Sequence, residues 1–309
     1  MKVHALPTCP ACGSADTRGF DIGEGRLLKR CQACETVSAL EYADPADVYT
    51  DGYMFGETDF GLDVRHPEFQ RYLAQVARRR MQIIEESTGG PGRLLDVGSG
   101  TGEVMIAARD RGWEIQGVEP ERTGAAFAQE RGLPVEVAML EDSGVPERAW
   151  DVVSAFHVLE HVPDPPAFLR TLARWARPGG HLVVEVPNFA SLQRRRLRQG
   201  WSGLRPLEHI THFTPKTLER LLRADGLEPV VVRSPAYVGP PQDLHHALAD
   251  LARGRRFERL FAPLSPYRQA NGERVRVPGR AGWAALRAME AAYDEAGRGT
   301  VVLAIARVA

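Results

Sequence analysis

Four cysteines form the most specific chemical pattern in the chain, and all of them lie before residue 35. Cys9 and Cys12 make one C-x₂-C pair, and Cys31 and Cys34 make a second pair after eighteen intervening residues. Two thiolates from each of two tight turns fill every position around a tetrahedral zinc ion, which leaves no position open for catalysis. The sequence therefore predicts a structural zinc site, and the alternative is a set of reduced, metal-free thiols.

Histidines gather in two further segments, each of which follows an apolar run. FHVLEH contains His157 and His161, while PLEHITHFTP contains Glu208, His209 and His212. Histidine suits proton transfer near neutral pH because its ordinary pKa lies there. Plainer roles stay open, since His161 can hydrogen-bond a neighbouring backbone group and His157 can touch a ligand without taking a proton.

A third pattern is the glycine-rich turn in LLDVGSGTGEV, where Gly98, Gly100 and Gly102 come between an apolar run and a helical one. Glycines allow the backbone to approach a ligand at a helix N-terminus, where N–H groups point outward. Glu103 stands where a dinucleotide fingerprint needs its third glycine, which disfavours nicotinamide and flavin cofactors. About twenty residues on, Glu119 ends the next apolar run and can accept hydrogen bonds from both ribose hydroxyls. The alternative is a tight turn without a ligand.

The elements that must position these residues alternate along 93–233. Apolar runs such as RLLDV, WEIQGVE, DVVSAF and GHLVVEVP are separated by amphipathic segments. This alternation is typical of an α/β fold with a parallel sheet that is covered on both faces. The turn, Glu119 and both histidine segments follow strands, so we expect them at the carboxyl edge, where such sheets bind ligands. Thr214 as N-cap, Pro215 at the first helical position and Gly226 as a stop predict a helix after the second histidine segment.

LLDVGSGTG resembles motif I of the class I S-adenosylmethionine-dependent methyltransferases. VEP at Glu119, DVVSAFHVLEHVPDP and RPGGHLVVEVPN extend this resemblance over about residues 50–232. It implies a Rossmann-like, doubly wound, seven-stranded sheet whose last strand, TVVLAIARV, runs antiparallel beside its predecessor. It also implies that Asp96, Gly98 and Gly100 hold the methionine end of S-adenosylmethionine, that Glu119 binds the ribose, and that the product is S-adenosylhomocysteine.

Adenine would meet the turn after the third strand, where Ala138 and Met139 replace the family's common Gly-Asp pair, so Leu140 and Glu141 are the substitutes that we expect. The positions expected to bind the cofactor are Asp96, Gly98, Ser99, Gly100, Gly102, Glu119, Pro120, Leu140, Glu141 and His157.

Five parts are expected along the chain: a zinc ribbon at 1–45, an aromatic and helical segment at 46–92, the cofactor-binding core at 93–233, a helical insertion at 234–297 and the last core strand at 298–309. The insertion is too long for a simple hairpin connection, so we expect it to form a lid. Tyr49, Tyr53 and Phe55 either close over the ligands or pack as a satellite cluster.

PLEHITHFT resembles a segment of certain deoxysugar C-methyltransferases, which use a Glu-His pair as the base and carry an N-terminal zinc-binding region. This resemblance implies that His209 is the base and that Glu208 orients it, with His157, His161 and His212 as the other candidates. H-x-x-E-H followed by H-x-x-H-F also resembles the small-RNA 2′-O-methyltransferases, which gather carboxylates and histidines around a divalent ion. In this chain His157 replaces one of those carboxylates.

Composition limits the classes of partner. The 309 residues are 43% hydrophobic and 26% charged with a net charge of −1, which is typical of a globular protein without a general attraction to nucleic acid or anionic membranes. The opening MKVHALPTCP lacks a signal-peptide core and no apolar stretch is long enough to cross a bilayer, so we expect a cytoplasmic protein that binds no membrane.

The acceptor is expected to be a small molecule, such as a sugar, a polyketide or another secondary metabolite, with oxygen slightly favoured over carbon and nitrogen. The run QRRRLRQ, with Arg194, Arg195, Arg196 and Arg198, predicts either a solvated helix face or a patch for a phosphorylated or carrier-bound acceptor. Two alternatives stay open: a metal-assisted RNA 2′-O-methyltransferase, and a cofactor-binding interaction module without catalysis.

Overall fold

The structure is a computed structural model that describes residues 2–22, 27–48, 50, 55, 64–65, 67–205, 207–235, 291–292 and 294–309. The lid predicted at 234–297 falls largely outside these residues, as do Tyr49 and Tyr53. Among the helices of the described ranges, none is both long and apolar enough to cross a lipid bilayer.

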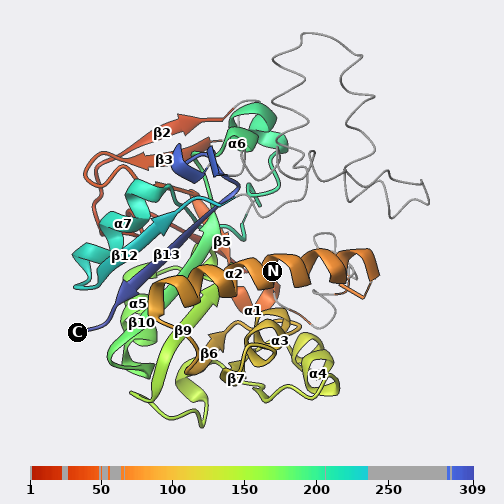
Figure 1. The fold of residues 1–309 in the computed structure, drawn as a ribbon. Coiled ribbons are helices and arrows are strands. Elements are labelled where there is room, and N and C mark those ends of the chain that lie inside the picture. The colour runs from red at the N-terminus through yellow and green to blue at the C-terminus, as the bar shows by residue number, and fades with distance from the viewer. Residues whose placement is uncertain are drawn as a thin grey trace, which may run out of the picture.

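A seven-stranded sheet forms the centre of the described structure (Figure 1). In chain order its strands are β6 (Arg93–Val97), β7 (Glu114–Val118), β8 (Val135–Glu136), β9 (Trp150–Phe156), β10 (Ala176–Pro187), β12 (Glu228–Arg233) and β13 (Val301–Arg307). Their spatial order is β12-β13-β10-β9-β6-β7-β8, and β13 runs antiparallel to both of its neighbours. The fold class expected from the sequence is therefore confirmed, including the antiparallel last strand beside its predecessor.

Helices cover both faces of this sheet. They are α2 (Pro67–Thr88), α3 (Glu103–Arg109), α4 (Arg122–Glu130), α5 (Pro165–Trp175) and α7 (Pro215–Ala224), with a short α1 (Pro45–Val48) before them. A further helix, α6 (Leu192–Leu197), packs through Leu197 against a separate cluster that contains Phe189 and Trp201. Apolar side chains of α2 and α3 pack with Leu94 and Val152 in one buried cluster. Those of α5 and α7 pack with Leu95 and Val153 in another. Neighbouring residues of β6 and β9 thus supply opposite faces, as the pleat of a strand requires.

The ends of α7 follow the predicted signals. The Thr214 side chain accepts a hydrogen bond from the backbone of Thr217, and Thr217 reciprocates in a capping box. Pro215 opens the helix, and Gly226 adopts a φ of 78° beyond its end. The third predicted strand, VEVAML, is shorter than expected, because only Val135 and Glu136 pair with β7, and Leu140–Asp142 form the 3₁₀ turn η2.

The N-terminal strands form two small sheets. β1 (Val3–Ala5) pairs with β5 (Glu41–Ala43). β2 (Thr17–Asp21), β3 (Leu27–Cys31) and β4 (Val37–Ser38) continue into β11 (Thr211–His212), a strand that belongs to the second histidine segment. Two further 3₁₀ turns, η3 (Leu159–His161) and η4 (Arg198–Gly200), lie in the connections at the carboxyl edge of the main sheet.

Candidate active site

The glycine-rich turn joins β6 to α3 and has the backbone that its sequence predicts. Gly98, Gly100 and Gly102 have φ values of 69°, 53° and 86°, in the left-handed region that favours glycine. A Cβ on Gly98 would lie 2.6 Å from Cγ2 of Val158, so the turn packs directly against the first histidine segment. The absence of a side chain at Gly98 therefore allows the glycine turn and the first histidine segment to lie against each other.

Glu119 follows β7 and is 4% exposed. Its Oε2 accepts a hydrogen bond of 2.7 Å from the Gly100 N–H, and its Oε1 accepts one of 2.8 Å from the Glu121 N–H. Burial raises the pKa of Glu119, while these two hydrogen bonds oppose the rise. The carboxylate thus fixes the glycine turn, and each of its oxygens keeps a second lone pair for a ligand hydroxyl.

Asp96, at the carboxyl end of β6, is 2% exposed and accepts a hydrogen bond of 2.7 Å from the Ser154 hydroxyl. Burial is the main reason that its pKa rises to about 7. Close to it in the chain, the buried hydroxyl of Ser99 has no hydrogen-bond partner within the described ranges. The site thus combines backbone N–H donors of the glycine turn, two buried carboxylate acceptors at adjacent strand ends and the Ser99 hydroxyl. This combination fits the amino acid and ribose parts of S-adenosylmethionine.

The region expected to meet adenine lies after β8. Leu140 is buried in η2, whereas Pro120 and Glu141 are exposed. Val137 and Met139 expose 44% and 57% of their surface, which leaves apolar side chains beside the expected adenine position. The contacts of Pro120, Leu140 and Glu141 with adenine stay a prediction.

The first histidine segment forms a charged network at the ends of β9 and β10. His157 lies with Nδ1 3.2 Å from Oε1 of Glu160 and with Nε2 3.4 Å from Oε1 of Glu185. Arg80, from α2, also hydrogen-bonds the same oxygen of Glu185, which is fully buried. Burial removes water from the imidazole of His157 and by itself would lower its pKa. The carboxylates of Glu160 and Glu185 outweigh this effect and raise the pKa of His157 to about 9. At neutral pH His157 is therefore protonated and donates to both carboxylates.

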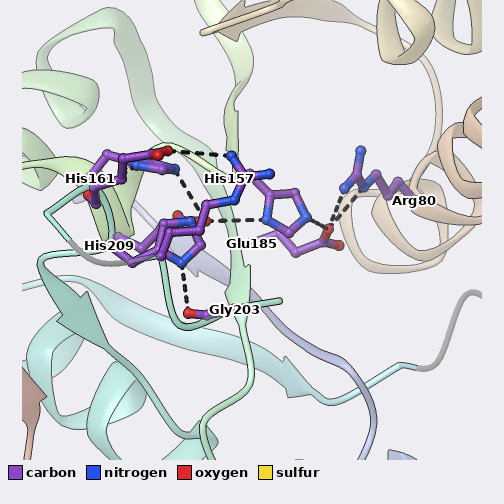
Figure 2. A network of polar contacts seen from close by, with 9 residues as sticks. Arg80, His157, His161, Glu185, Gly203 and His209 are labelled. Carbon is purple, nitrogen blue, oxygen red and sulfur yellow. Dashed lines mark hydrogen bonds and ion pairs between the residues drawn. The ribbon is translucent and has the colours of Figure 1, made fainter. Parts of the chain in front are cut away.

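The second network lies on the other side of His157 (Figure 2). His161 Nδ1 lies 3.2 Å from the Glu208 carbonyl, and His209 Nδ1 lies 2.9 Å from the Gly203 carbonyl. Because a carbonyl oxygen only accepts, this pattern assigns the proton to each Nδ1 and leaves each Nε2 with a lone pair.

Burial lowers the pKa of both of these histidines, that of His161 to about 3, so both rings are neutral at pH 7. Glu160, His161 and His209 each offer a ligand atom, and these atoms lie within 4.8 Å of one another. Glu160 is 1% exposed, and its Oε2 has no hydrogen-bond partner among the described residues. The cluster is thus able to accept either a proton or a cation.

Glu208 and His212 take different places from those of the other candidates. The carboxylate of Glu208 lies 3.3 Å from Arg205, so the group that orients His209 is the Gly203 carbonyl, and Glu208 contributes its own carbonyl to His161. His212 is 5% exposed in β11, and its ring lies tilted against that of Phe189 with 5.2 Å between the ring centroids. Burial lowers the pKa of His212 to about 3.

Sequence reasoning did not single out Arg80, Glu185 or Gly203. Glu185 carries a detectable signal, because a carboxylate inside the apolar run GHLVVEVP must find a buried partner. Arg80 is one of three consecutive arginines on a helix, and nothing local separates it from its neighbours. Gly203 acts through its carbonyl, which no residue type encodes.

The four cysteine thiols also lie together, each within 4.8 Å of the others. The Sγ atoms of Cys9 and Cys34 are 3.5 Å apart, as are those of Cys12 and Cys31. Sulfur atoms around a tetrahedral zinc ion with bonds of about 2.3 Å lie about 3.8 Å apart, so the residues fit this metal. The backbone N–H of Cys34 points at the Cys31 sulfur at 3.5 Å, and the buried Lys29 ammonium donates to the Thr8 carbonyl at 2.8 Å.

The chain is similar in sequence to known methyltransferases. An O-methyltransferase of ubiquinone biosynthesis from Acinetobacter baumannii (strain AYE) is 32% identical over 138 residues, which are 40% of this chain and 56% of the relative. One with the same description from Aeromonas salmonicida (strain A449) is 31% identical over 170 residues, 50% of this chain and 71% of the relative. This chain therefore spans little more than half the length of the first of these relatives.

Among solved structures, an S-adenosylmethionine-dependent methyltransferase from Thermotoga maritima is 19% identical, covers 78% of this chain and 95% of its own, and has a TM-score of 0.47. Residues 69–232, more than half of the chain, match the family described as a methyltransferase domain. The match begins in α2 and ends in β12, so it includes the glycine turn, Glu119 and both histidine segments. The chain belongs to this family, the class I S-adenosylmethionine-dependent methyltransferases.

Proposed function

We propose that the protein transfers a methyl group from S-adenosylmethionine to an oxygen atom of a small-molecule acceptor, with His209 as the general base. The observation that carries this proposal is the contact of Val158 with Gly98, because it sets the first histidine segment against the glycine turn, and the centroid of the His161 ring of that segment lies 4.5 Å from that of the His209 ring. The expected cofactor site and the only neutral, buried imidazoles of the described active-site segments then lie at one edge of the sheet.

Different residues of the site would bind different parts of the cofactor. Asp96 and the backbone of Gly98 and Gly100 would hold the amino acid part of the cofactor, and Glu119 would hold its ribose. When bound, S-adenosylmethionine supplies a methyl group that is already activated on a sulfonium. The remaining tasks of the protein are to align the acceptor and to remove its proton.

His209 suits proton removal for two reasons. Its Nδ1 is fixed by the Gly203 carbonyl, so Nε2 presents a lone pair in one orientation. Burial also lowers its pKa, so this lone pair is available at neutral pH. His157 is the opposite case, because its raised pKa keeps it protonated; we propose that it acts as a hydrogen-bond donor near the cofactor.

Oxygen is favoured as the acceptor atom because the relatives from Acinetobacter baumannii and Aeromonas salmonicida are O-methyltransferases of ubiquinone biosynthesis. Those proteins are described as acting in ubiquinone biosynthesis, so we add phenols to sugars and polyketides as acceptors to try first. A phosphorylated or carrier-bound acceptor would meet arginines of α6, of which Arg194 already lies over the Phe189 ring at 4.0 Å.

A panel of phenols, sugars and polyketides with S-adenosylmethionine tests the proposal. His209→Gln and His209→Ala should lower turnover by about 10²- to 10⁴-fold, while S-adenosylhomocysteine binds as in the wild type. His4→Gln, at a half-exposed histidine that stacks on Tyr42, is the matched control and should keep wild-type turnover. Near-normal turnover of both His209 variants would refute the role of this residue. Binding of the cofactor without transfer to any acceptor would instead favour an interaction module.

A second candidate is metal-assisted methyl transfer, as in an RNA 2′-O-methyltransferase. It is favoured by the Nε2 lone pairs of His161 and His209 beside Glu160, whose Oε2 has no partner among the described residues. Metal analysis should then find two metal ions per chain, and Glu160→Gln should remove one of them. A single metal ion per chain in both the wild type and the Glu160→Gln variant would argue against this candidate. RNA binding without a strong salt dependence would also argue against it.

For the N-terminal region we propose a structural zinc ion held by Cys9, Cys12, Cys31 and Cys34. A region this small cannot bury a large apolar core, so metal binding would supply much of its folding free energy. One zinc ion per chain that is lost in Cys12→Ser is the expected result.

A further inference from the structure

The cysteine region and the second histidine segment share one sheet. In β11, Thr211 pairs with Ser38 and His212 pairs with Val37, and β4 in turn pairs with β3. Outside the paired strands the Ala39 N–H donates to the Ile210 carbonyl at 2.9 Å. The contact between the cysteine region and this segment is therefore a backbone ladder that continues to the residue directly after His209.

Ile210 connects this ladder to the rest of the site. Its carbonyl accepts from Ala39, and its N–H donates to the Glu160 carbonyl at 2.8 Å. Ile210 is 1% exposed, so both hydrogen bonds are shielded from water. One residue thus ties the cysteine region on one side to the first histidine segment on the other.

The position of β4 depends on the second cysteine pair. Cys31 ends β3, and the turn Cys31–Cys34 leads directly into β4. This turn is closed by the Cys31 N–H, which donates to the Thr36 carbonyl at 2.9 Å, and by the Cys34 N–H, which points at the Cys31 sulfur. A metal ion on Cys31 and Cys34 would hold the same turn through its side chains.

β11 is poorly suited to stand alone. It contains two residues, lies at the edge of its sheet and pairs only with β4 in that sheet. Such a short strand is stable only when its partner is fixed. An independent contact also exists, since the chain continues through the isolated bridge between Asn188 and Phe213, and Phe213 is fully buried. Phe213 anchors the end of the segment beyond His212, and the hydrogen bond from Ile210 to Glu160 ties the residues before His212 to the first histidine segment. The ladder to β4 is the contact that holds these residues from the other side.

We propose that the four-cysteine region is a positioning element for the active site: the metal-held turn fixes β4, and β4 fixes the register and orientation of residues 207–212, which carry His209. This inference rests on the proposed role of His209 and on the proposed zinc ion. It assigns the cysteine region a task within the methyl-transfer site, in addition to its own folding.

Hydrogen exchange on the full-length chain, with and without a zinc chelator, tests this coupling without an acceptor. In the zinc-free protein, peptides from 27–43 and from 207–212 should both exchange at least about tenfold faster, while peptides from 93–120 should stay protected. The affinity for S-adenosylhomocysteine should change by less than about twofold, because the glycine turn and Glu119 lie outside the ladder.

Nitrogen NMR of the histidine rings gives a second readout. With zinc present, His209 should show one fixed tautomer with its proton on Nδ1, as the hydrogen bond to the Gly203 carbonyl requires. Removal of zinc, or Cys12→Ser at the exposed cysteine of the cluster, should replace this signature with that of a mobile ring. Lys216→Ala removes one of the two surface ion pairs that Glu35, next to the Cys31–Cys34 turn, makes with α7, so it should leave both readouts unchanged.

Protection of 207–212 in the zinc-free protein, together with an unchanged His209 tautomer, would overturn the proposal. That result would mean that packing around Phe213 holds the segment without the cysteine region. Failure of the proposed function has a different signature, because it would abolish binding of S-adenosylhomocysteine or leave turnover intact in the His209 variants.

Discussion

Asp96, which we propose holds the amino acid part of the cofactor, is expected to make cofactor binding depend on pH. Its carboxyl group is buried, and this burial is the main reason that its pKa rises from an ordinary 3.8 to about 7. The bound amino group of the cofactor would favour the ionised form, so binding must release the proton that Asp96 holds. Affinity should therefore rise with pH through the region around 7.

The size of this effect follows from the two protonation states. With a pKa of about 7 in the free protein, protonation weakens binding by a factor of about 11 at pH 6, about 2 at pH 7 and about 1.1 at pH 8. S-adenosylhomocysteine should thus bind about tenfold more weakly at pH 6 than at pH 8. The number of protons released should fall from about 0.9 to about 0.1 over the same range.

Titration calorimetry at pH 6, 7 and 8, in two buffers of different ionisation enthalpy, measures both quantities. Asp96→Asn cannot ionise, so it should bind without this pH dependence and more weakly at pH 8, by about 10- to 100-fold for the loss of a charged hydrogen bond. Asp110→Asn, at the exposed end of α3, is the matched control and should retain the dependence. Equal wild-type affinity at pH 6 and pH 8 without proton release would refute the reasoning.

The same carboxyl group also affects the stability of the free protein. The folded state binds more protons than the unfolded state between pH 3.8 and about 7, because the pKa of Asp96 is raised on folding. Its contribution to the free energy of unfolding therefore falls as pH rises through this window and stays low above it. Saturating S-adenosylhomocysteine should offset this loss above pH 7.

Two further predictions concern the framework of the site. Gly98→Ala should lower the free energy of unfolding by about 2–4 kcal/mol and weaken S-adenosylhomocysteine binding, because the new Cβ would collide with Val158. The control is Gly132→Ala, where φ is a similar 73° but the space around the residue is open. It should cost about 1–2 kcal/mol by urea denaturation and leave binding intact. Arg80→Met should lower the free energy of unfolding by about 3–5 kcal/mol, because it removes a partner of the buried Glu185 carboxylate. Adding Glu185→Gln to this variant should recover at least half of the lost stability. Additive losses in the double variant would contradict the pairing of these two residues.

The sequence predicts the parts of this protein whose signals are local. The glycine turn, the capping of α7 and the succession of strands each depend on residues within a few positions of one another, and the structure contains all three. β8 is shorter than VEVAML predicts, because apolar character continues past Glu136 while pairing with β7 does not.

Non-local pairing lies beyond such reasoning. The ladder between 37–39 and 210–212 joins segments more than 170 residues apart. Neither β4 nor β11 has a sequence pattern that predicts which strand it pairs with. The hydrogen-bond partner of His209 could not be predicted from the sequence either. The resemblance of the PLEHITHFT segment to deoxysugar C-methyltransferases implied that Glu208 orients His209. In the structure the His209 Nδ1 is hydrogen-bonded to the backbone carbonyl of Gly203, and the His209 N–H donates to the carbonyl of Arg205.

The grip of the glycine turn and Glu119 on the cofactor is tested most directly by the affinity of Glu119→Ala for S-adenosylhomocysteine, measured by calorimetry on protein whose fold is verified by circular dichroism. Two hydrogen bonds from ribose hydroxyls to a carboxylate contribute about 1.5–3 kcal/mol each, so the wild type should bind one equivalent and the variant should bind at least about 100-fold more weakly. Wild-type affinity in Glu119→Ala, or no binding by the wild type itself, would contradict the account.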